Sequence, residues 1–456
     1  MSYQYYDVLI SSHSLEGLIA GSMLAKGGAR VLVLDHYSPY VERGPYRFDI
    51  DPSPFTRLGT NGLFQKILKN LNLSYEEQKR FQLLEPTLQI LKPRMRLSIP
   101  SQLKDLKKEL TRECPENANE LLQFRTDLHE WLEQFIFEQP PLPWWKVWLK
   151  KSKKEEPIAP LENLKSKEVL APFLAPMAQS FSSYSVHTLS SAQRLYLALG
   201  YLGDAYYYRG GKAALRDLFR RQLKFYGGEC LPEAKIEKIH VEHREIRTLE
   251  LDRNPRAVRC RYVVRIGKGA DFFGLCPEGF RLRRWVKRLS QPSAMITHRL
   301  YFGLKSEGVP VGLGPRALLI SNSNRYLVLT LSPEEESSYA PAGKRILTVE
   351  MHELLNPETP TTLTSSKEKE MFTLLKEIFP FLEQHIDLYL PGNAEGLSSP
   401  SVLWSPKRTR KIGKTPFRNA YYLGPEGGDG LGFENRIQRI HQVVENLRSN
   451  LFHGAK

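Results

Sequence analysis

Residues 5–35, YYDVLISSHSLEGLIAGSMLAKGGARVLVLD, restrict the fold more than any other stretch of the chain. The pattern predicts a buried strand over 7–10, a tight turn, a helix over 15–26, a Gly-Gly break and a second strand over 30–34. Both strands are near-continuous apolar runs, as is typical of parallel strands covered on both faces. The stretch therefore predicts a βαβ unit, whose first turn opens a helix N-terminus suited to a dinucleotide pyrophosphate.

The glycine fingerprint of such units is only partly present. The pattern G-x-G-x-x-G falls on SHSLEG, so that Gly17 is the single glycine left. Ser12 occupies the tight turn, His13 follows it, and Ser14 stands where the backbone approaches the pyrophosphate. Asp35 ends the second strand near the offset at which an acidic side chain binds a ribose hydroxyl. We predict that these residues contact a nucleotide, and the alternative is a βαβ unit kept as architecture alone.

Length and composition predict a two-domain globular protein, or one domain with a large insertion. The chain has 456 residues, of which 41% are hydrophobic and 25% charged, as is ordinary for such proteins. No apolar run reaches membrane-spanning length, and no signal peptide is expected. Four widely spaced cysteines, without CxxC pairs or histidines at metal-binding spacing, predict reduced thiols in the cytoplasm and no metal site.

The charge of the chain requires a hypothesis about its partner. The formal net charge is +15 and the isoelectric point is near 9.4. Anionic lipid, nucleic acid or an acidic protein would all be attracted. Because the basic residues are spread along the chain without a nucleic-acid-binding motif, we do not expect nucleic acid.

One segment favours contact with a membrane. Residues 101–139 predict two amphipathic helices broken at a proline, and they are followed by PPLPWWKVWLKKSKKEEPIAP. Tryptophan beside lysine is typical of the membrane interface. We predict membrane or partner contact through this loop, and an exposed linker whose tryptophans cover a helix is the alternative. The residues concerned are Trp144, Trp145, Trp148, Lys150 and Lys151.

The rest of the chain alternates between irregular, helical and β-rich segments. Residues 36–68, rich in Pro, Gly and aromatics, predict a long irregular segment. Residues 293–305, 316–324, 325–332 and 345–351 predict strands of an antiparallel sheet by their alternation. The last segment predicts a Gly-rich turn and a terminal amphipathic helix.

The order of these elements resembles the FAD-dependent phytoene desaturase and carotenoid isomerase group, close to the amine oxidases. Four blocks carry the resemblance: YDVLISSHSLEGLIAGSMLAKGGARVLVLD, RGGKAALRDLFRRQLKFYGGEC, AKIEKIHVEHREIRTLELDRNPRAVRCRYVVRIG and NAYYLGPEGGDGLGFENRIQRI. The resemblance implies an α/β fold, with a Rossmann-like FAD/NAD(P)-binding domain and an inserted α+β substrate domain.

The resemblance also implies how the chain is divided. Three pieces, residues 1–100, 206–290 and 393–456, would form the FAD-binding-type domain. The substrate domain would be formed by two pieces. The first is helical, residues 101–205, and contains the Trp/Lys loop at 139–155; the second is a sheet with a helix, residues 291–392.

For the cofactor, the resemblance implies FAD, held also by the last block. Gly424, Gly430 and Gly432 are retained there. Two residues depart from the family pattern: Pro425 replaces an aspartate that accepts a hydrogen bond from the ribityl chain, and Asn435 replaces a glycine beside the isoalloxazine. Together with Ser12 and Ser14, these departures would all weaken the binding of FAD.

Two functions follow from the resemblance, and the residues identify no catalytic group for either. The first is an oxidoreductase that transfers a hydride from a lipophilic, polyene-like substrate to flavin, or isomerises it with the flavin's help. The second is a non-catalytic, flavin-free descendant that serves as a scaffold or assembly subunit and binds a protein partner or a membrane through its basic surface. A third reading keeps the pocket for NAD(P) or ADP through Asp35. We expect a location in the cytoplasm, with the inner face of a membrane as a possible place of association.

Overall fold

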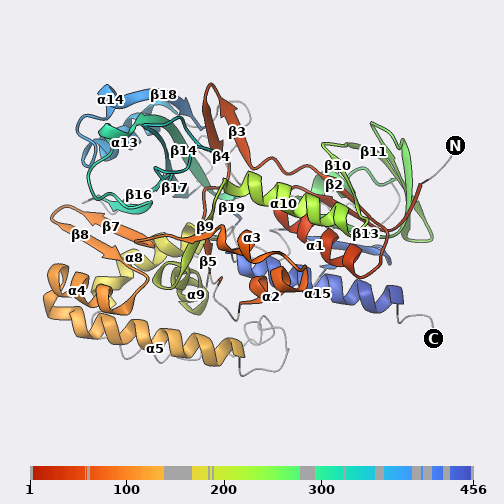
Figure 1. Ribbon diagram of the computed structural model, residues 1–456, viewed down its shortest axis with the longest axis horizontal. Coiled ribbons are helices and arrows are strands. Elements are labelled where there is room, and N and C mark those ends of the chain that lie inside the picture. Colours follow the sequence, from red (N-terminus) through yellow and green to blue (C-terminus); the bar gives the residue numbers. More distant parts are fainter. Residues whose placement is uncertain are drawn as a thin grey trace.

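The computed structural model describes residues 4–56, 58, 62–137, 167–182, 185–186, 189, 191–277, 293–321, 325–354, 364–392, 402–403, 413–424 and 432–452. These residues form two large sheets with helices packed against them, joined by a smaller sheet and a hairpin (Figure 1). The first sheet lies at the end of the molecule that holds both chain termini, and the second sheet lies at the opposite end.

The first sheet contains the βαβ unit predicted at the N-terminus. Its strand order is β10-β2-β1-β13-β12-β11, with β21 beside the end of β13 and β20 beside β21. Strands β10, β2, β1, β13 and β21 are parallel, and β11, β12 and β13 form an antiparallel meander. The bounds are β1 Gln4–Ser12, β2 Val31–Asp35, β10 Glu229–Pro232, β11 Ile236–Glu242, β12 Glu245–Leu251, β13 Ala257–Ile266, β20 Gly413–Lys414 and β21 Ala420–Leu423.

Three helices cover one face of this sheet. Helix α1, Leu15–Lys26, packs between α10, Gly211–Phe225, and α15, Gly432–Phe452 (Figure 1). The apolar side chains of β1 and β2 that point to this face are buried with those of the helices in one core. The helix predicted over residues 15–26 is confirmed, as is the terminal amphipathic helix, whose apolar stripe is buried. The other face packs against α11, Gly269–Phe273, and the meander.

The second sheet is mainly antiparallel, as the alternation in residues 293–351 predicted. Its order is β18-β14-β17-β16-β15-β7-β8, with β19 beside β14. The bounds are β7 Leu88–Lys92, β8 Met95–Ile99, β14 Ser293–Lys305, β15 Arg316–Ile320, β16 Tyr326–Leu331, β17 Lys344–Leu354, β18 Ile386–Pro391 and β19 Val402–Leu403. Helix α13, Ser365–Lys376, the short α14, Leu382–His385, and the turn η3, Ser306–Gly308, accompany the sheet.

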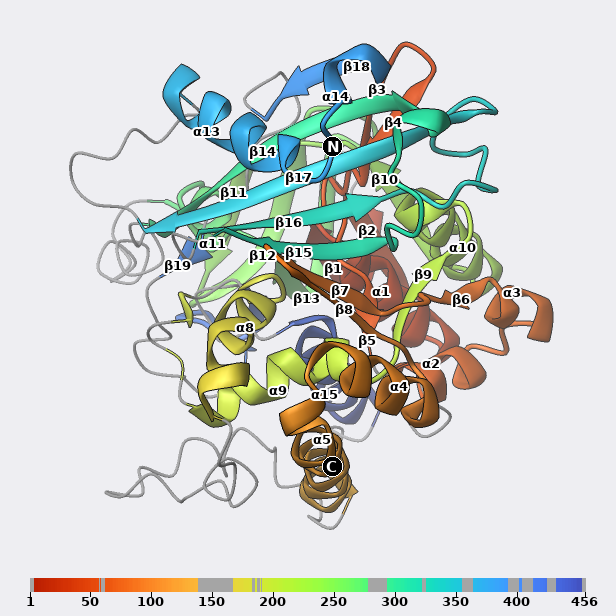
Figure 2. The same ribbon diagram turned by 90° about the vertical axis from the view of Figure 1, so that its left-hand side faces the viewer.

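Helices cover both faces of this sheet (Figure 2). One face buries apolar residues of α13 and α14. The opposite face packs against the helices that follow β8. These helices, joined by the turn η1, Pro115–Asn117, are α4 Leu103–Glu113, α5 Ala118–Phe137, α8 Lys167–Gln179 and α9 Ser191–Leu202. The predicted break between α4 and α5 is confirmed at Pro115.

Two parts of the N-terminal prediction need correction. Residues 36–68 are not wholly irregular, because they contain the hairpin β3–β4, the short strand β5 and the start of α2. Strands β7 and β8, assigned by the prediction to the FAD-binding-type domain, instead extend the second sheet, since β7 pairs with β15. The prediction failed here because the pairing partner of β7, strand β15, comes more than 200 residues later in the chain. The remaining domain boundaries stay a prediction.

A small layer lies where the two large sheets meet. Its three strands have the order β5-β9-β6, and the chain reaches them from the β3–β4 hairpin on one side and from α3 on the other. The bounds are β3 Tyr40–Arg43, β4 Tyr46–Asp49, β5 Phe55–Thr56, α2 Leu63–Asn70, α3 Tyr75–Lys79, β6 Phe81–Leu83 and β9 Ala205–Tyr208. None of the helices in the described segments has the length and hydropathy needed to span a membrane.

Candidate functional site

The turn between β1 and α1 is closed by a serine side chain. The Ser12 hydroxyl donates to the backbone oxygen of Ser14 at 2.9 Å and accepts the Ser14 backbone N–H at 3.1 Å. That N–H belongs to the group that a phosphate would use at a helix N-terminus. The Ser12 side chain therefore takes up one N–H of the turn that the intact fingerprint would leave to a ligand.

Gly17 is retained because Ser12 is present. A Cβ at Gly17 would lie 2.2 Å from the Ser12 Cβ, which is far inside van der Waals contact. We expect Gly17→Ala to lower the free energy of unfolding by about 1–3 kcal/mol, the cost of overpacking. In a Ser12→Gly background the cost should disappear, because alanine then gains helix propensity over glycine. A double-mutant cycle by denaturant unfolding measures this coupling, and equal costs in the two backgrounds would contradict the proposed contact.

Asp35 lies at the end of β2, but its carboxylate is already bound within the protein. Its side chain is 0% exposed. Oδ1 accepts the Tyr37 backbone N–H at 3.0 Å, and Oδ2 contacts Arg216 Nε at 3.2 Å and Arg220 Nη2 at 2.7 Å. Both arginines come from α10, one helical turn apart. The carboxylate that the fingerprint offers to a ribose is thus enclosed and neutralised by α10.

A second ion pair lies at the N-terminus of α1. Glu16, in the first turn, has a side chain only 4% exposed, and its Oε1 accepts Arg436 Nε at 2.5 Å. Burial by itself raises the pKa of Glu16, but attraction to Arg436, with the neighbouring Ser14 hydroxyl, outweighs it, so that the net pKa is lowered. The chain itself therefore supplies the negative charge that a helix N-terminus favours, in place of a pyrophosphate.

Two histidines are stacked above the same edge of the sheet. Ser12 and Asp35 are paired in the register of β1 and β2, so the residues that follow them, His13 and His36, are neighbours. Their rings stack with centroids 4.8 Å apart. Burial, followed by the positive charge of Arg265, lowers the pKa of His13 to about 4, so that His13 is neutral at pH 7.

The structure brings most of the predicted nucleotide residues together. A Cβ at Gly424, after β21, would lie 2.6 Å from the Gly267 oxygen, and Gly267 lies beside His13. Gly432 begins α15, whose Arg436 reaches Glu16. The N-terminal crossover and the C-terminal helix therefore converge on one edge of the first sheet. Asn435 is buried on α15.

Several predicted residues lie outside the described part of the chain. At the C-terminal turn these are Pro425 and Gly430. In the loop predicted to contact a membrane, the residues outside the described part of the chain are Trp144, Trp145, Trp148, Lys150 and Lys151. The four cysteines are free thiols. Within the described segments, no group of three or more His, Cys, Asp or Glu side chains is placed to hold a metal ion.

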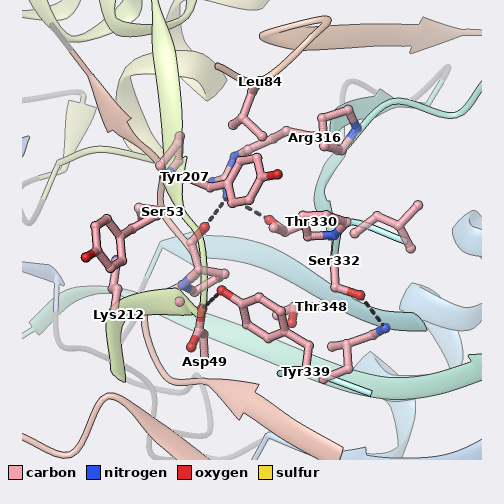
Figure 3. Close-up of a pocket in the computed structure, with 18 of the residues that line it drawn as sticks. Asp49, Ser53, Leu84, Tyr207, Lys212, Arg316, Thr330, Ser332, Tyr339 and Thr348 are labelled. Carbon is pink, nitrogen blue, oxygen red and sulfur yellow. Dashed lines mark hydrogen bonds between the residues drawn. The ribbon is translucent and has the colours of Figure 1, made fainter. Parts of the chain in front are cut away.

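A cavity of about 80 Å³, called here the junction cavity, lies between the small β5-β9-β6 layer, the start of α10 and the second sheet (Figure 3). Much of its wall is formed by aromatic and aliphatic side chains of β5, β9, β16 and β17 and by prolines that flank the strands. Its polar side chains are paired within the protein: Arg316 donates to Thr330 Oγ1 at 2.6 Å, and the Tyr339 hydroxyl donates to Asp49 at 3.1 Å. Lys212 pairs with Asp51 at 2.7 Å. Burial raises the pKa of Asp49 to about 7.

Solved structures with the same overall fold cover nearly the whole chain. An oxidoreductase from Methanosarcina mazei is 16% identical, with a TM-score of 0.66 over 96% of this chain and all of that one. A putrescine oxidase redesigned in cofactor binding is 12% identical, with a TM-score of 0.60 over 98% of this chain and all of that one.

The fold is that of the amine-oxidase-like flavoproteins. RAB GDI from Plasmodium falciparum shares it, with 14% identity and a TM-score of 0.55 over 98% of both chains. No family model and no curated protein matches the sequence. At these identities the likeness shows the fold alone, so the expected fold class is confirmed, whereas membership of the phytoene desaturase group stays a prediction.

The described residues do not fit FAD. The acidic ribose partner is enclosed by Arg216 and Arg220, the turn is closed by Ser12, and the helix N-terminus already carries the Glu16–Arg436 pair. A nucleotide ribose would have to compete with Arg216 and Arg220 for the fully buried Asp35 carboxylate, and removing a partner from such a buried charge is expensive.

Only weak signals for the ion pairs that close the site are present in the sequence. Glu16 is the one charged residue in the apolar stretch SHSLEGLIAGSMLA, and Arg216 and Arg220 are four residues apart on a predicted helix. Such spacing places both arginines on one face. Their common partner could not be read from the chain, because it lies some 180 positions earlier.

Proposed function

We propose that this chain is a non-catalytic, flavin-free binding protein built on the fold of FAD-dependent oxidoreductases. The observation that carries the proposal is the Asp35 carboxylate, which has a fully buried side chain and two arginine partners. A ribose hydroxyl competing for it would replace contacts from two cationic guanidinium groups by one hydrogen bond from an uncharged donor. The same argument opposes NAD(P) and ADP, since both would need the same acidic partner.

The retained architecture supports a binding role. Among the described residues, the strands and helices that border the site keep the arrangement of the fold, and the departures from the fingerprint lie at positions that would touch a cofactor. The buried cores of both large sheets are extensive. Such a chain keeps the surfaces of the fold while its nucleotide cleft becomes part of the packed interior.

A lipophilic-substrate oxidoreductase is the second candidate, and the junction cavity favours it. Its wall is largely apolar and aromatic, as ligand sites usually are. Its volume of about 80 Å³ is, however, well below the several hundred Å³ typical of organic ligands. The polyene-like substrate would therefore require the cavity to enlarge.

The flavin content of the purified protein tests the proposal. Protein expressed in a flavin-replete host should release no flavin on denaturation, as measured by absorbance and fluorescence against a putrescine oxidase purified in parallel. The expected result follows from the paired state of Asp35 and Glu16. Flavin released in a one-to-one ratio with the chain would overturn the proposal and establish the oxidoreductase alternative as the better one.

A further inference from the structure

We propose that helices α2, α3 and α10 form a docking face for an anionic membrane surface. This proposal rests on the proposed function, because it identifies the partner to which the proposed binding protein would bind. Its residues lie outside the nucleotide site, so its test can fail while the flavin test succeeds. We call this surface the basic aromatic face; it is defined by Lys69, Tyr75, Lys79, Arg221, Lys224 and Phe225.

Helix α10 has three faces with different tasks. One is buried in the core and holds Leu215, Leu218, Phe219 and Leu223. The second carries Arg216 and Arg220 to Asp35. The third is exposed and holds Asp217, Arg221, Lys224 and Phe225. The third face therefore contributes neither to the core nor to the contacts with Asp35, and it is accessible to a binding partner.

Two aromatic side chains are strongly exposed on this surface. Phe225, at the end of α10, is 77% exposed, and Tyr75, at the start of α3, is 69% exposed. The Lys79 ammonium lies 4.3 Å from the centre of the Tyr75 ring, and Lys224 precedes Phe225 in the chain. Exposed rings beside lysines are the pattern that interfacial membrane contact uses, with the ring at headgroup depth and the ammonium at the phosphate.

The three helices are fixed to one another. Arg221 of α10 contacts Glu77 of α3 at 3.4 Å, and the Tyr226 hydroxyl donates to the Leu71 oxygen, just after α2, at 2.8 Å. Both Figures 1 and 2 place α3 near α2 and α10, and in Figure 2 the three helices lie at the right-hand side of the molecule. The aromatic and basic groups therefore belong to one preformed surface.

The charge of this surface is positive. The basic side chains of α2, α3, the residue after α3 and the exposed part of α10 are Lys66, Lys69, Lys79, Arg80, Arg221 and Lys224. The acidic ones are Glu76, Glu77 and Asp217. Glu77 is engaged inside the surface, where it accepts the Tyr208 hydroxyl at 2.8 Å. The excess of positive charge favours an anionic surface over a neutral one.

Vesicle sedimentation tests the proposal with the full chain. We expect binding to phosphatidylcholine vesicles that contain about 30% phosphatidylglycerol, little binding to phosphatidylcholine alone, and loss of binding at about 0.5 M salt. Lys69→Ala and Lys224→Ala should each weaken binding about 5-fold, and about 30-fold together. Phe225→Ser should weaken it about 10-fold or more, because one apolar ring no longer enters the interface.

Matched controls separate this face from the rest of the surface. Lys235→Ala with Lys238→Ala, at the exposed meander, and Phe381→Ser, at an exposed ring 64% accessible, should leave binding within about 2-fold. Thermal unfolding checks that each variant is folded. Absence of binding to anionic vesicles overturns the proposal and favours a protein partner. Binding that survives the lysine and Phe225 changes but is lost on replacing the three tryptophans of the 139–155 loop also overturns it.

Discussion

Asp35→Asn should lower the free energy of unfolding by about 3 kcal/mol. The amide has the same shape, but it cannot balance the two guanidinium groups that approach Oδ2 at 3.2 and 2.7 Å. Breaking a buried ion pair costs about 3–5 kcal/mol, and the lower end applies because the Arg216 and Arg220 side chains keep 14% and 24% of their exposure. Urea denaturation followed by circular dichroism measures the change.

A matched control lies on the same helix. Asp217→Asn replaces an exposed carboxylate of α10 and should change stability by less than about 0.5 kcal/mol. If Asp35→Asn were as mild as Asp217→Asn, the carboxylate would not be the partner of both arginines, and the account of the closed site would lose its main support.

Glu350→Gln should have the largest effect, about 3–5 kcal/mol. Glu350 lies between Arg299 at 2.7 Å and Arg316 at 3.9 Å, and the three side chains are 5%, 4% and 1% exposed. Without the carboxylate, two positive charges would stay in the core of the second sheet. Because Arg316 also borders the junction cavity, the change should disturb that cavity as well.

The effect of Glu350 should depend on pH. Burial by itself raises the pKa of Glu350, but attraction to Arg299 and Arg316 outweighs it, and the net pKa is lowered. A lowered pKa stabilises the fold above the unfolded-state pKa, and that stabilisation is lost as pH falls through the folded-state pKa. The difference between wild type and Glu350→Gln should therefore be largest near neutrality and shrink in acid. Glu377→Gln, exposed after α13, is the control, and a difference that is independent of pH would contradict the ion pair.

Much of the fold could be predicted from local pattern. The apolar runs and Gly-Gly break in residues 5–35 determined β1, α1 and β2, and the spacing of apolar residues determined α4, α5 and α15. Strands β7 and β8 were missed because their partner, β15, comes more than 200 residues later. Pairing across such a separation leaves no local signal, so the pairing of β7 with β15 could not be predicted from the sequence.

The place of the candidate residues in the fold could be predicted, but the ion pairs that their side chains form could not. Ser12 and Ser14 correctly marked a turn that departs from the dinucleotide pattern, and Asp35 lies where the offset from Gly17 placed it. What the pattern could not give was the partner of each charge. From the sequence, the Asp35 carboxylate looks available to a nucleotide, yet in the structure it is bound by α10. Glu16 has no evident role in the sequence, yet it pairs with a residue 420 positions away.

These ion pairs connect elements on both sides of the candidate site. Asp35 connects β2 to α10, and Glu16 connects α1 to α15. A dinucleotide in this cleft would contact the same strand end and the same helix N-terminus. The side chains thus join elements that a bound nucleotide would otherwise bridge.

Calorimetric titration of the wild-type protein with FAD tests the central claim most directly. With Asp35 and Glu16 paired inside the chain, we predict no saturable heat at FAD concentrations up to about 0.1 mM. Saturable one-to-one binding with a dissociation constant in the micromolar range or tighter would contradict the account, because it would require the cleft to accept a nucleotide while both ion pairs are present.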